Sequence, residues 1–315
     1  AWQEIHGAPG AQIYPLIRKI DTLSSNSYLI ATPDTLTLID PGGLVPQVES
    51  LSVVIGESRT ESELPVFAFL THAHIDHFIG VQGVPAFAHS HAVVFAVQET
   101  GARALESGDT KLTQSSLLQT PVAPMKIGLH LLTEERSRLH GVPASLCFPN
   151  GAEISIVQDL FGGKSSDGIP RERITFGPGP VLEVYHTPGH SPDSICLRMG
   201  DLLFIGDLLF AASPGIAGLI GWSQQDLLRS LDAIGDLLAT GGIRLVCPGH
   251  GRAITAPDAA RMLAMVKRDA LALDGIAELN QERAAQTAAF AEDCMEEINE
   301  LFTIMAGRLQ YAAYV

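Results

Sequence analysis

Thr71-His72-Ala73-His74-Ile75-Asp76-His77 is the stretch that decides how this chain is interpreted. It places three imidazoles and a carboxylate between positions 72 and 77, directly after the apolar run 66–70, which we expect to be a buried strand. Loops that follow strands are common places for several functional side chains to converge. Three of the chain's 11 histidines fall inside this window, and the cluster therefore predicts a metal site at a strand end.

The composition is that of a globular protein. Of the 315 residues, 46% are hydrophobic and 30 are glycine, which indicates a sizeable core with many tight turns. The length fits one large α/β catalytic domain with a smaller appendage. We place the domain at residues 1–256, with an insertion at about 100–150, and a C-terminal helical extension at residues 257–315.

The charge disfavours nucleic acid as a partner. Twenty Lys and Arg against 35 Asp and Glu give a net charge of −15, which repels phosphate backbones. The longest apolar stretch, 202–222, is interrupted by Asp207 and by Ser213-Pro214-Gly215, so it predicts core and not a membrane span. The expected partner is therefore a small-molecule substrate, without a membrane or a nucleic acid.

The cysteines predict neither a zinc ribbon nor a redox dithiol, because Cys147, Cys196, Cys247 and Cys294 are widely spaced and form no CxxC pair. A chain of this size needs no disulfides, so we expect reduced thiols. The start, Ala1-Trp2-Gln3-Glu4, lacks the charged and apolar regions of a signal peptide. Both features favour a cytoplasmic location.

Hydrophobic patterning predicts a β-rich opening followed by strand, loop and helix units. The expected strands are residues 13–17, 35–39, 66–70, 84–88, 153–157, 173–176, 182–186, 194–199, 202–205 and 243–247. We expect the first two to be antiparallel strands on either side of polar turn residues. The expected helices are residues 47–56, one or two helices within 91–118 that Gly101 and Gly108 interrupt, a helix capped by Ser223, and the chain from Pro257 onward.

Two segments have more than one interpretation. Residues 121–141 have no clear period and are either a lid over the site or an ordinary surface excursion. Near the C-terminus, apolar residues at three- and four-residue steps predict a long amphipathic helix. That helix either packs on its own domain or pairs two subunits as a homodimer. Its stripe comprises Phe290, Cys294, Ile298, Leu301, Phe302, Met305 and Leu309.

Three later positions have the same character as the first cluster. His190 lies in Pro188-Gly189-His190-Ser191, Asp207 follows Gly206, and His250 lies in Pro248-Gly249-His250-Gly251, each after a strand-like run. Taken singly, a histidine after Pro-Gly is more often a turn residue than a ligand. Taken in order, the set resembles the ligands of the metallo-β-lactamase superfamily, and the resemblance runs from about residue 13 to residue 255.

The resemblance implies an α/β fold, a four-layer αββα metallo-β-lactamase sandwich with the metals at the lip of its two sheets. It assigns one metal to His72, His74 and His190. It assigns the second to Asp76, His77 and His250, with Asp207 bridging the two. Two divalent ions are expected: zinc suits these ligands best, and iron or manganese are the alternatives.

The same resemblance implies an enzyme. Two ions about 3.5–4 Å apart can share a hydroxide and polarise a substrate oxygen. Asp76 would be catalytic, because its carboxylate could orient that hydroxide. The pattern is most similar to glyoxalase II and thioesterase-like hydrolases, which cleave an ester, thioester or related acyl bond. The alternatives are a mononuclear-iron persulfide dioxygenase, a phosphodiesterase, and a non-catalytic ligand-binding regulator.

Other polar residues are expected to support the site or to lie outside it. Metal-bound imidazoles usually need an acceptor for their second nitrogen, and Asp40 and Ser191 are the candidates for this role. We expect structural or surface roles for His89, His91 and His186, with His186 close to the site. His130 and His140 lie inside the segment that could form a lid and could touch substrate there, although their spacing does not require it.

Overall fold

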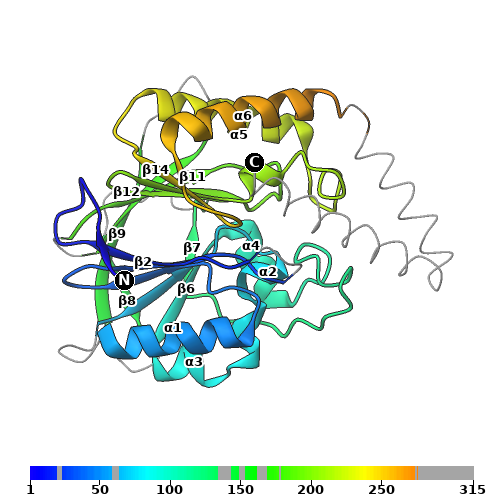
Figure 1. Cartoon of the computed structure of the whole chain (residues 1–315). Helices are drawn as coiled ribbons and strands as arrows, with labels where there is room; N and C mark the ends of the chain where they lie inside the picture. The colour runs from blue at the N-terminus through cyan, green and yellow to red at the C-terminus, as the bar shows by residue number, and fades with distance from the viewer. Residues whose placement is uncertain are drawn as a thin grey trace.

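Two β-sheets lie face to face at the centre of the molecule (Figure 1). The structure, a computed structural model, describes residues 1–19, 23–58, 64–133, 143–148, 153–161, 169–176, 179–273 and 275. The first sheet has seven strands in chain order: β1 (Gln3–Glu4), β2 (Gln12–Leu16), β3 (Ser27–Ala31), β4 (Leu36–Ile39), β5 (Val66–Phe69), β6 (Val93–Gln98) and β7 (Leu129–Leu131). The second has eight, also in chain order: β8 (Pro143–Cys147), β9 (Glu153–Leu160), β10 (Arg171–Phe176), β11 (Leu182–His186), β12 (Ile195–Met199), β13 (Leu202–Gly206), β14 (Leu245–Pro248) and β15 (Ile254–Thr255).

Helices cover the outer faces of both sheets. In Figure 1, α1 (Val45–Ser58) and α3 (Ala86–Ser90) lie below the first sheet, and α5 (Gln224–Ala239) and α6 (Ala256–Leu271) lie above the second. The described part of the chain also contains α4 (Glu99–Ser107), the short α2 (Ile75–Phe78) and the 3-10 turns η1 (Ile79–Gly83) and η3 (Leu208–Phe210). The expected four-layer αββα sandwich is confirmed. No described helix combines the length and apolar character needed to cross a bilayer.

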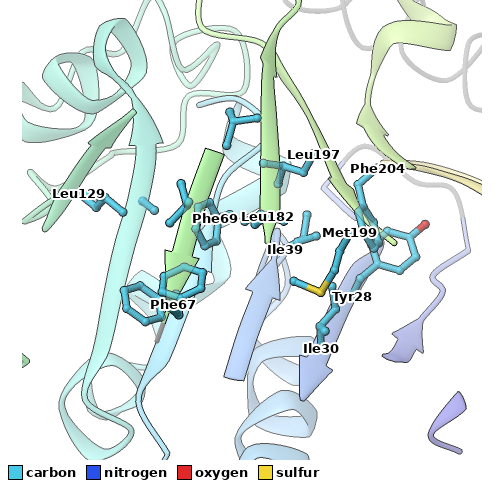
Figure 2. Close-up of a cluster of buried hydrophobic side chains, with 14 of the residues drawn as sticks. Tyr28, Ile30, Ile39, Phe67, Phe69, Leu129, Leu182, Leu197, Met199 and Phe204 are labelled. Atoms are coloured by element: carbon cyan, nitrogen blue, oxygen red, sulfur yellow. The ribbon is translucent and has the colours of Figure 1, made fainter. Parts of the chain in front are cut away.

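Side-chain alternation along each strand divides the apolar residues between the layers. Phe67 and Phe69 of β5 join the cluster between the two sheets, whereas Val66 and Ala68 pack on the helix side. The Phe67 ring lies 4.4 Å from the Phe176 ring of the opposite sheet, measured between centroids. Figure 2 shows this inter-sheet core, which fixes the two sheets relative to one another and therefore fixes their edges.

Parallel pairing brings the ends of several strands to common edges. Strands β4, β5, β6 and β7 run parallel, and so do β13 and β14. Within each of these two sets of strands, the carboxyl-terminal ends therefore point the same way, and the loops that leave them lie side by side. The fold positions the candidate metal ligands through this arrangement.

The opening of the chain differs from expectation by one strand. The expected strands 13–17 and 35–39 correspond to β2 and β4, but they do not pair with each other, because β3 lies between them and pairs antiparallel with both. The polar run before β3 predicted a turn. Ser24, Ser25, Asn26 and Ser27 are instead buried, and their side chains make hydrogen bonds inside the molecule.

The prediction of a strand at 84–88 is wrong. Within 91–118, where we expected one or two helices, residues 93–98 are a strand and the helix α4 follows at Glu99–Ser107. Residues 86–90 form α3, and the strand is β6. All six residues of β6 are buried, so it shows no polar alternation to distinguish it from a buried helix. Gly101 does not interrupt the helix but lies inside α4, whereas Gly108 ends it with a φ of +68°, as expected.

The later predictions are largely confirmed. The expected strands 153–157, 173–176, 182–186, 194–199, 202–205 and 243–247 correspond to β9 to β14, and Ser223 caps α5 by accepting a hydrogen bond from Asp226 N. Part of the irregular segment 121–141 is the strand β7, paired with β6, and residues 134–142 lie outside the described residues. The helix α6 bears out the helical start of the extension. The stripe from Phe290 to Leu309 lies outside the described residues, so pairing of two subunits through it stays a prediction.

Candidate metal centre

Four loops bring the seven candidate ligands together. The loop after β5 carries residues 72–77, and α2 begins within it at Ile75. His190 follows β11, Asp207 follows β13 and His250 follows β14. Since β11 and β13 are both antiparallel to β12, and β14 is parallel to β13, these three loops leave the second sheet at the same edge.

The first group consists of His72, His74 and His190. All three side chains are buried, and one nitrogen from each lies within 4.8 Å of the others. His74 Nδ1 and His190 Nε2 face each other at 2.9 Å. Three imidazoles converging on one point suit zinc and several other divalent ions.

The second group consists of Asp76, His77, Asp207 and His250. His250 Nε2 lies 3.2 Å from both Asp76 Oδ2 and Asp207 Oδ2, and His77 Nε2 lies 3.4 Å from Asp207 Oδ1. Asp207 also reaches the first group, because its Oδ2 lies 3.8 Å from His190 Nε2. The structure therefore brings all seven predicted residues together and places the Asp207 carboxylate between the two groups.

The residues present fit bound metal. Among the described residues, His72 Nε2, His77 Nε2 and Asp207 Oδ1 are buried and have no hydrogen-bond partner. Buried polar atoms of native proteins are nearly always satisfied, so unpaired atoms that face a shared space indicate a ligand. The five imidazoles and the carboxylates of Asp76 and Asp207 supply nitrogen and oxygen donors that divalent ions accept.

The two groups differ in their electrostatics. Burial lowers the pKa values of the His72 and His190 imidazoles and lowers that of His74 to about 3, which favours the neutral form that binds metal. Burial also opposes the charge of His250, but the carboxylates of Asp207 and Asp76 outweigh it and raise its pKa to about 10. The second group thus holds cationic imidazoles beside carboxylates, and a divalent cation could replace the protons.

Asp40 supports His77 from the end of β4, as expected. Its Oδ2 accepts hydrogen bonds from His77 Nδ1 at 2.9 Å and from Thr71 Oγ1 at 2.8 Å, and its Oδ1 accepts one from Thr71 N at 2.8 Å. A carboxylate only accepts, so His77 Nδ1 carries a hydrogen and Nε2 faces the centre. Asp40 has a φ of +52°, a conformation that Asp and Asn tolerate better than most residues.

Ser191 supports the site differently from the expected role. Its hydroxyl does not hold an imidazole but donates to Asp193 Oδ1 at 2.7 Å. Asp193, which the sequence analysis missed, is buried, and its Oδ2 accepts from the backbone N of Ala73 at 2.8 Å. Gly101 packs against this carboxylate, since a Cβ added there would lie 2.2 Å from Asp193 Oδ2. The only sequence signal for Asp193 is a carboxylate three residues after a candidate ligand.

The other histidines take no part in the two groups, among the residues that the structure describes. His186 Nε2 lies 2.9 Å from the carbonyl oxygen of Pro192, next to the loop that carries His190. His130 Nε2 pairs with Glu106 at the surface. His89 lies on α3 and His91 at its end, and His140 lies outside the described residues.

A cleft of about 750 Å³ runs along α4 beside the loop of His190. None of the seven candidate ligands lines it, and its walls mix both charges with small apolar side chains. It is lined by Gln98, Glu99, Thr100, Arg103, Ala104, Ser107, Asp109, Leu112, Leu132, Pro170 and His186. The cleft is therefore separate from the seven-residue centre.

Comparisons with known proteins point to the same protein family. The profile of the metallo-beta-lactamase superfamily matches residues 20–250. The chain is 25% identical over 241 residues to the probable metallo-hydrolase YqgX of Bacillus subtilis (strain 168), covering 74% of this chain and 87% of that one. It is 26% identical over 243 residues to the acyl-coenzyme A thioesterase MBLAC2 of Homo sapiens, covering 72% of each.

Solved structures agree on the fold. BLEG-1, a B3 metallo-beta-lactamase, is 26% identical with a TM-score of 0.52, covering 78% of this chain and 94% of that one. ETHE1 from Myxococcus xanthus is similar in fold, with a TM-score of 0.51, 19% identity, and coverage of 83% and 88%. Because the superfamily profile spans well over half of the sequence, the chain belongs to the metallo-beta-lactamase superfamily.

Proposed function

We propose that the protein hydrolyses a thioester or a related acyl ester of a small substrate, with divalent metal held by the seven centre residues. The family and its curated metallo-hydrolase relatives make the chain a hydrolase of the metallo-beta-lactamase fold. The thioester substrate class rests on the similarity to the acyl-coenzyme A thioesterase MBLAC2 over most of both chains.

The observation that carries the proposal is the buried seven-residue centre combined with the state of the thiols. Among the described cysteines, Cys196 and Cys247 are buried, and burial raises both pKa values to about 12. The Cys147 thiol is exposed, and its hydrogen bond to Glu153 raises its pKa. Thiols in these states are poor nucleophiles. Water is therefore the proposed nucleophile, and no acyl intermediate on any of these three cysteines is expected.

The chain's own residues divide the work of that reaction. His72, His74 and His190 would hold one ion, Asp76, His77 and His250 the other, and Asp207 would contact both. Bound divalent metal activates water near neutral pH and polarises a substrate oxygen. Asp76 is the most exposed of the seven side chains, at 17%, and its carboxylate is the group that would orient the attacking water.

The test combines metal analysis with a substrate panel. We expect two divalent ions per chain, zinc in preference to iron or manganese, and release of free thiol from acyl-coenzyme A esters. Asp207→Ala should lose metal and activity together, whereas Asp232→Ala, which removes an exposed carboxylate paired with Lys267, should keep both. Full activity and two ions in Asp207→Ala would refute the bridging role.

The same panel separates other reactions from the proposed one. Turnover of phosphodiesters without turnover of thioesters or esters would assign a phosphodiesterase. One iron per chain with oxygen consumption on a persulfide would assign sulfur oxidation. Bound metal without turnover of any class would leave a binding role.

A further inference from the structure

The segment just before β3 contacts the loop that carries His250. Asn26 is 1% exposed, and its side-chain Nδ2 donates hydrogen bonds to the carbonyl oxygens of Pro248 at 3.0 Å and Gly251 at 2.8 Å. Its backbone N donates to Gly249 O at 2.6 Å. This one residue just before β3 therefore holds three of the four carbonyls between positions 248 and 251.

Neighbours of Asn26 strengthen the same contact. The Tyr28 hydroxyl donates to Pro248 O at 2.7 Å. Ser25 Oγ donates to the backbone oxygen of Asp76 at 2.9 Å, which ties the segment to a second residue of the same ligand group. Gln47 of α1 fixes the segment from behind, because its Nε2 donates to Ser25 O and Ser27 Oγ.

The first ligand group has a different support. The carboxylate of Asp193 accepts from the backbone N of Ala73, the residue between His72 and His74, and lies in the loop that carries His190. Its other oxygen is held by Ser191. Asp193 thus joins the two loops of the first group, whereas the segment before β3 contacts the second group through Asn26 at the His250 loop and through Ser25 at Asp76.

We propose that the two metal positions are set by separate buried braces, with Asn26 as the positioning residue of the second ligand group and Asp193 as that of the first. This inference rests on the proposed metal-binding function. Neither side chain reaches a candidate ligand atom, so each acts through the backbone of a ligand loop. Loss of one brace should therefore affect one metal more than the other.

Each brace is expected to affect metal affinity because it supplies hydrogen bonds to the backbone of a ligand loop. Without Asn26, the carbonyls of Pro248 and Gly251 lose the side-chain donor that joins them to the opposite sheet, and His250 loses its fixed backbone. Without Asp193, the buried N–H of Ala73 loses its acceptor. Partners that orient metal ligands are typically worth about 10–100-fold in metal affinity.

The experiment measures zinc affinity at each position by competition with a chelator, in the full chain. His250→Ala disables the second group and leaves a one-metal protein, and His190→Ala does the same for the first. In the His250→Ala background, Asp193→Ala should weaken the remaining metal at least 10-fold, whereas Asn26→Ala should change it less than 3-fold. In the His190→Ala background the order should reverse.

Two milder variants cover the case in which a truncation fails to fold. Tyr28→Phe removes one hydroxyl donor to Pro248, and Ser191→Ala removes the donor that orients Asp193. Each should weaken the metal on its own side, and the melting temperature of the metal-free protein reports any general loss of stability. Equal weakening of both metals by either brace would overturn the inference while leaving the hydrolase proposal intact. A wild-type chain that binds no metal would overturn both.

Discussion

His77 Nδ1 and Asp40 Oδ2 lie 2.9 Å apart in a buried contact that joins the end of β4 to the loop after β5. The contact turns His77 Nε2 toward Asp76 and Asp207. Because β4 and β5 are parallel neighbours, Asp40 also accepts a hydrogen bond from the backbone N–H of Thr71 and so fixes the start of the loop that carries residues 72–77.

Asp40→Asn should weaken the second metal selectively. Asparagine tolerates the φ of +52° at this position, so the backbone is expected to survive, but the amide loses the charge and one of the acceptor oxygens. We expect an affinity loss of about 10–100-fold in zinc competition experiments. Asp34→Asn, at an exposed position, is the control and should leave both affinities unchanged. Wild-type affinity in Asp40→Asn would remove Asp40 from the support of His77.

Gly249→Ala should disable the second group by steric conflict. A Cβ added at Gly249 would lie 2.3 Å from Asp207 Oδ1 and 2.9 Å from His77 Cε1, so the carboxylate and the imidazole would both have to move. We expect loss of one metal per chain and at least a 100-fold fall in hydrolysis, measured by metal analysis and initial rates. Retention of both metals would contradict the close approach of this turn to Asp207.

Two helical glycines should respond to alanine with opposite signs. Gly235 lies in α5 with nothing within 4 Å of an added Cβ, so Gly235→Ala should stabilise the protein by about 1 kcal/mol through helix propensity. Gly101 lies in α4, and a Cβ added there would lie only 2.2 Å from Asp193 Oδ2, so Gly101→Ala should destabilise the protein. Urea unfolding of the two variants measures the difference, and a gain of stability in both would place Asp193 away from α4.

The candidate site was largely predictable from the sequence because its ligands are reactive residue types at strand ends. The cluster from His72 to His77 directly follows a short apolar run, and His190, Asp207 and His250 each follow another. The grouping of these residues required the superfamily resemblance, since spacing along the chain does not say which strands are neighbours. Asn26 and Asp193 escaped notice because their roles depend on backbone groups far away in the sequence.

The fold was less predictable where burial removes the usual patterns. The buried polar residues before β3 have the composition of a turn, and only the loops that they contact explain their burial. Strand β6 is buried on both faces, as expected of a central parallel strand, so its apolar run does not distinguish strand from helix. From the sequence, Gly101 resembles a helix breaker. The structure shows that glycine is needed there because the Asp193 carboxylate leaves no room for a side chain, and Asp193 lies 92 positions further along the chain.

Removal of metal should lower the stability of the whole domain and not only its activity. The second sheet contributes His190, Asp207 and His250, and the first contributes residues 72–77, so bound metal would cross-link the two sheets at one edge. A ligand that binds only the folded state at 100 times its dissociation constant adds about 2.7 kcal/mol. We therefore expect treatment with a chelator to lower the melting temperature by roughly 5–10 °C, and added zinc to restore it. Asp207→Ala should show a much smaller response to the chelator. An unchanged melting temperature in wild-type protein that has demonstrably lost its metal would mean that the two sheets hold this edge together without it.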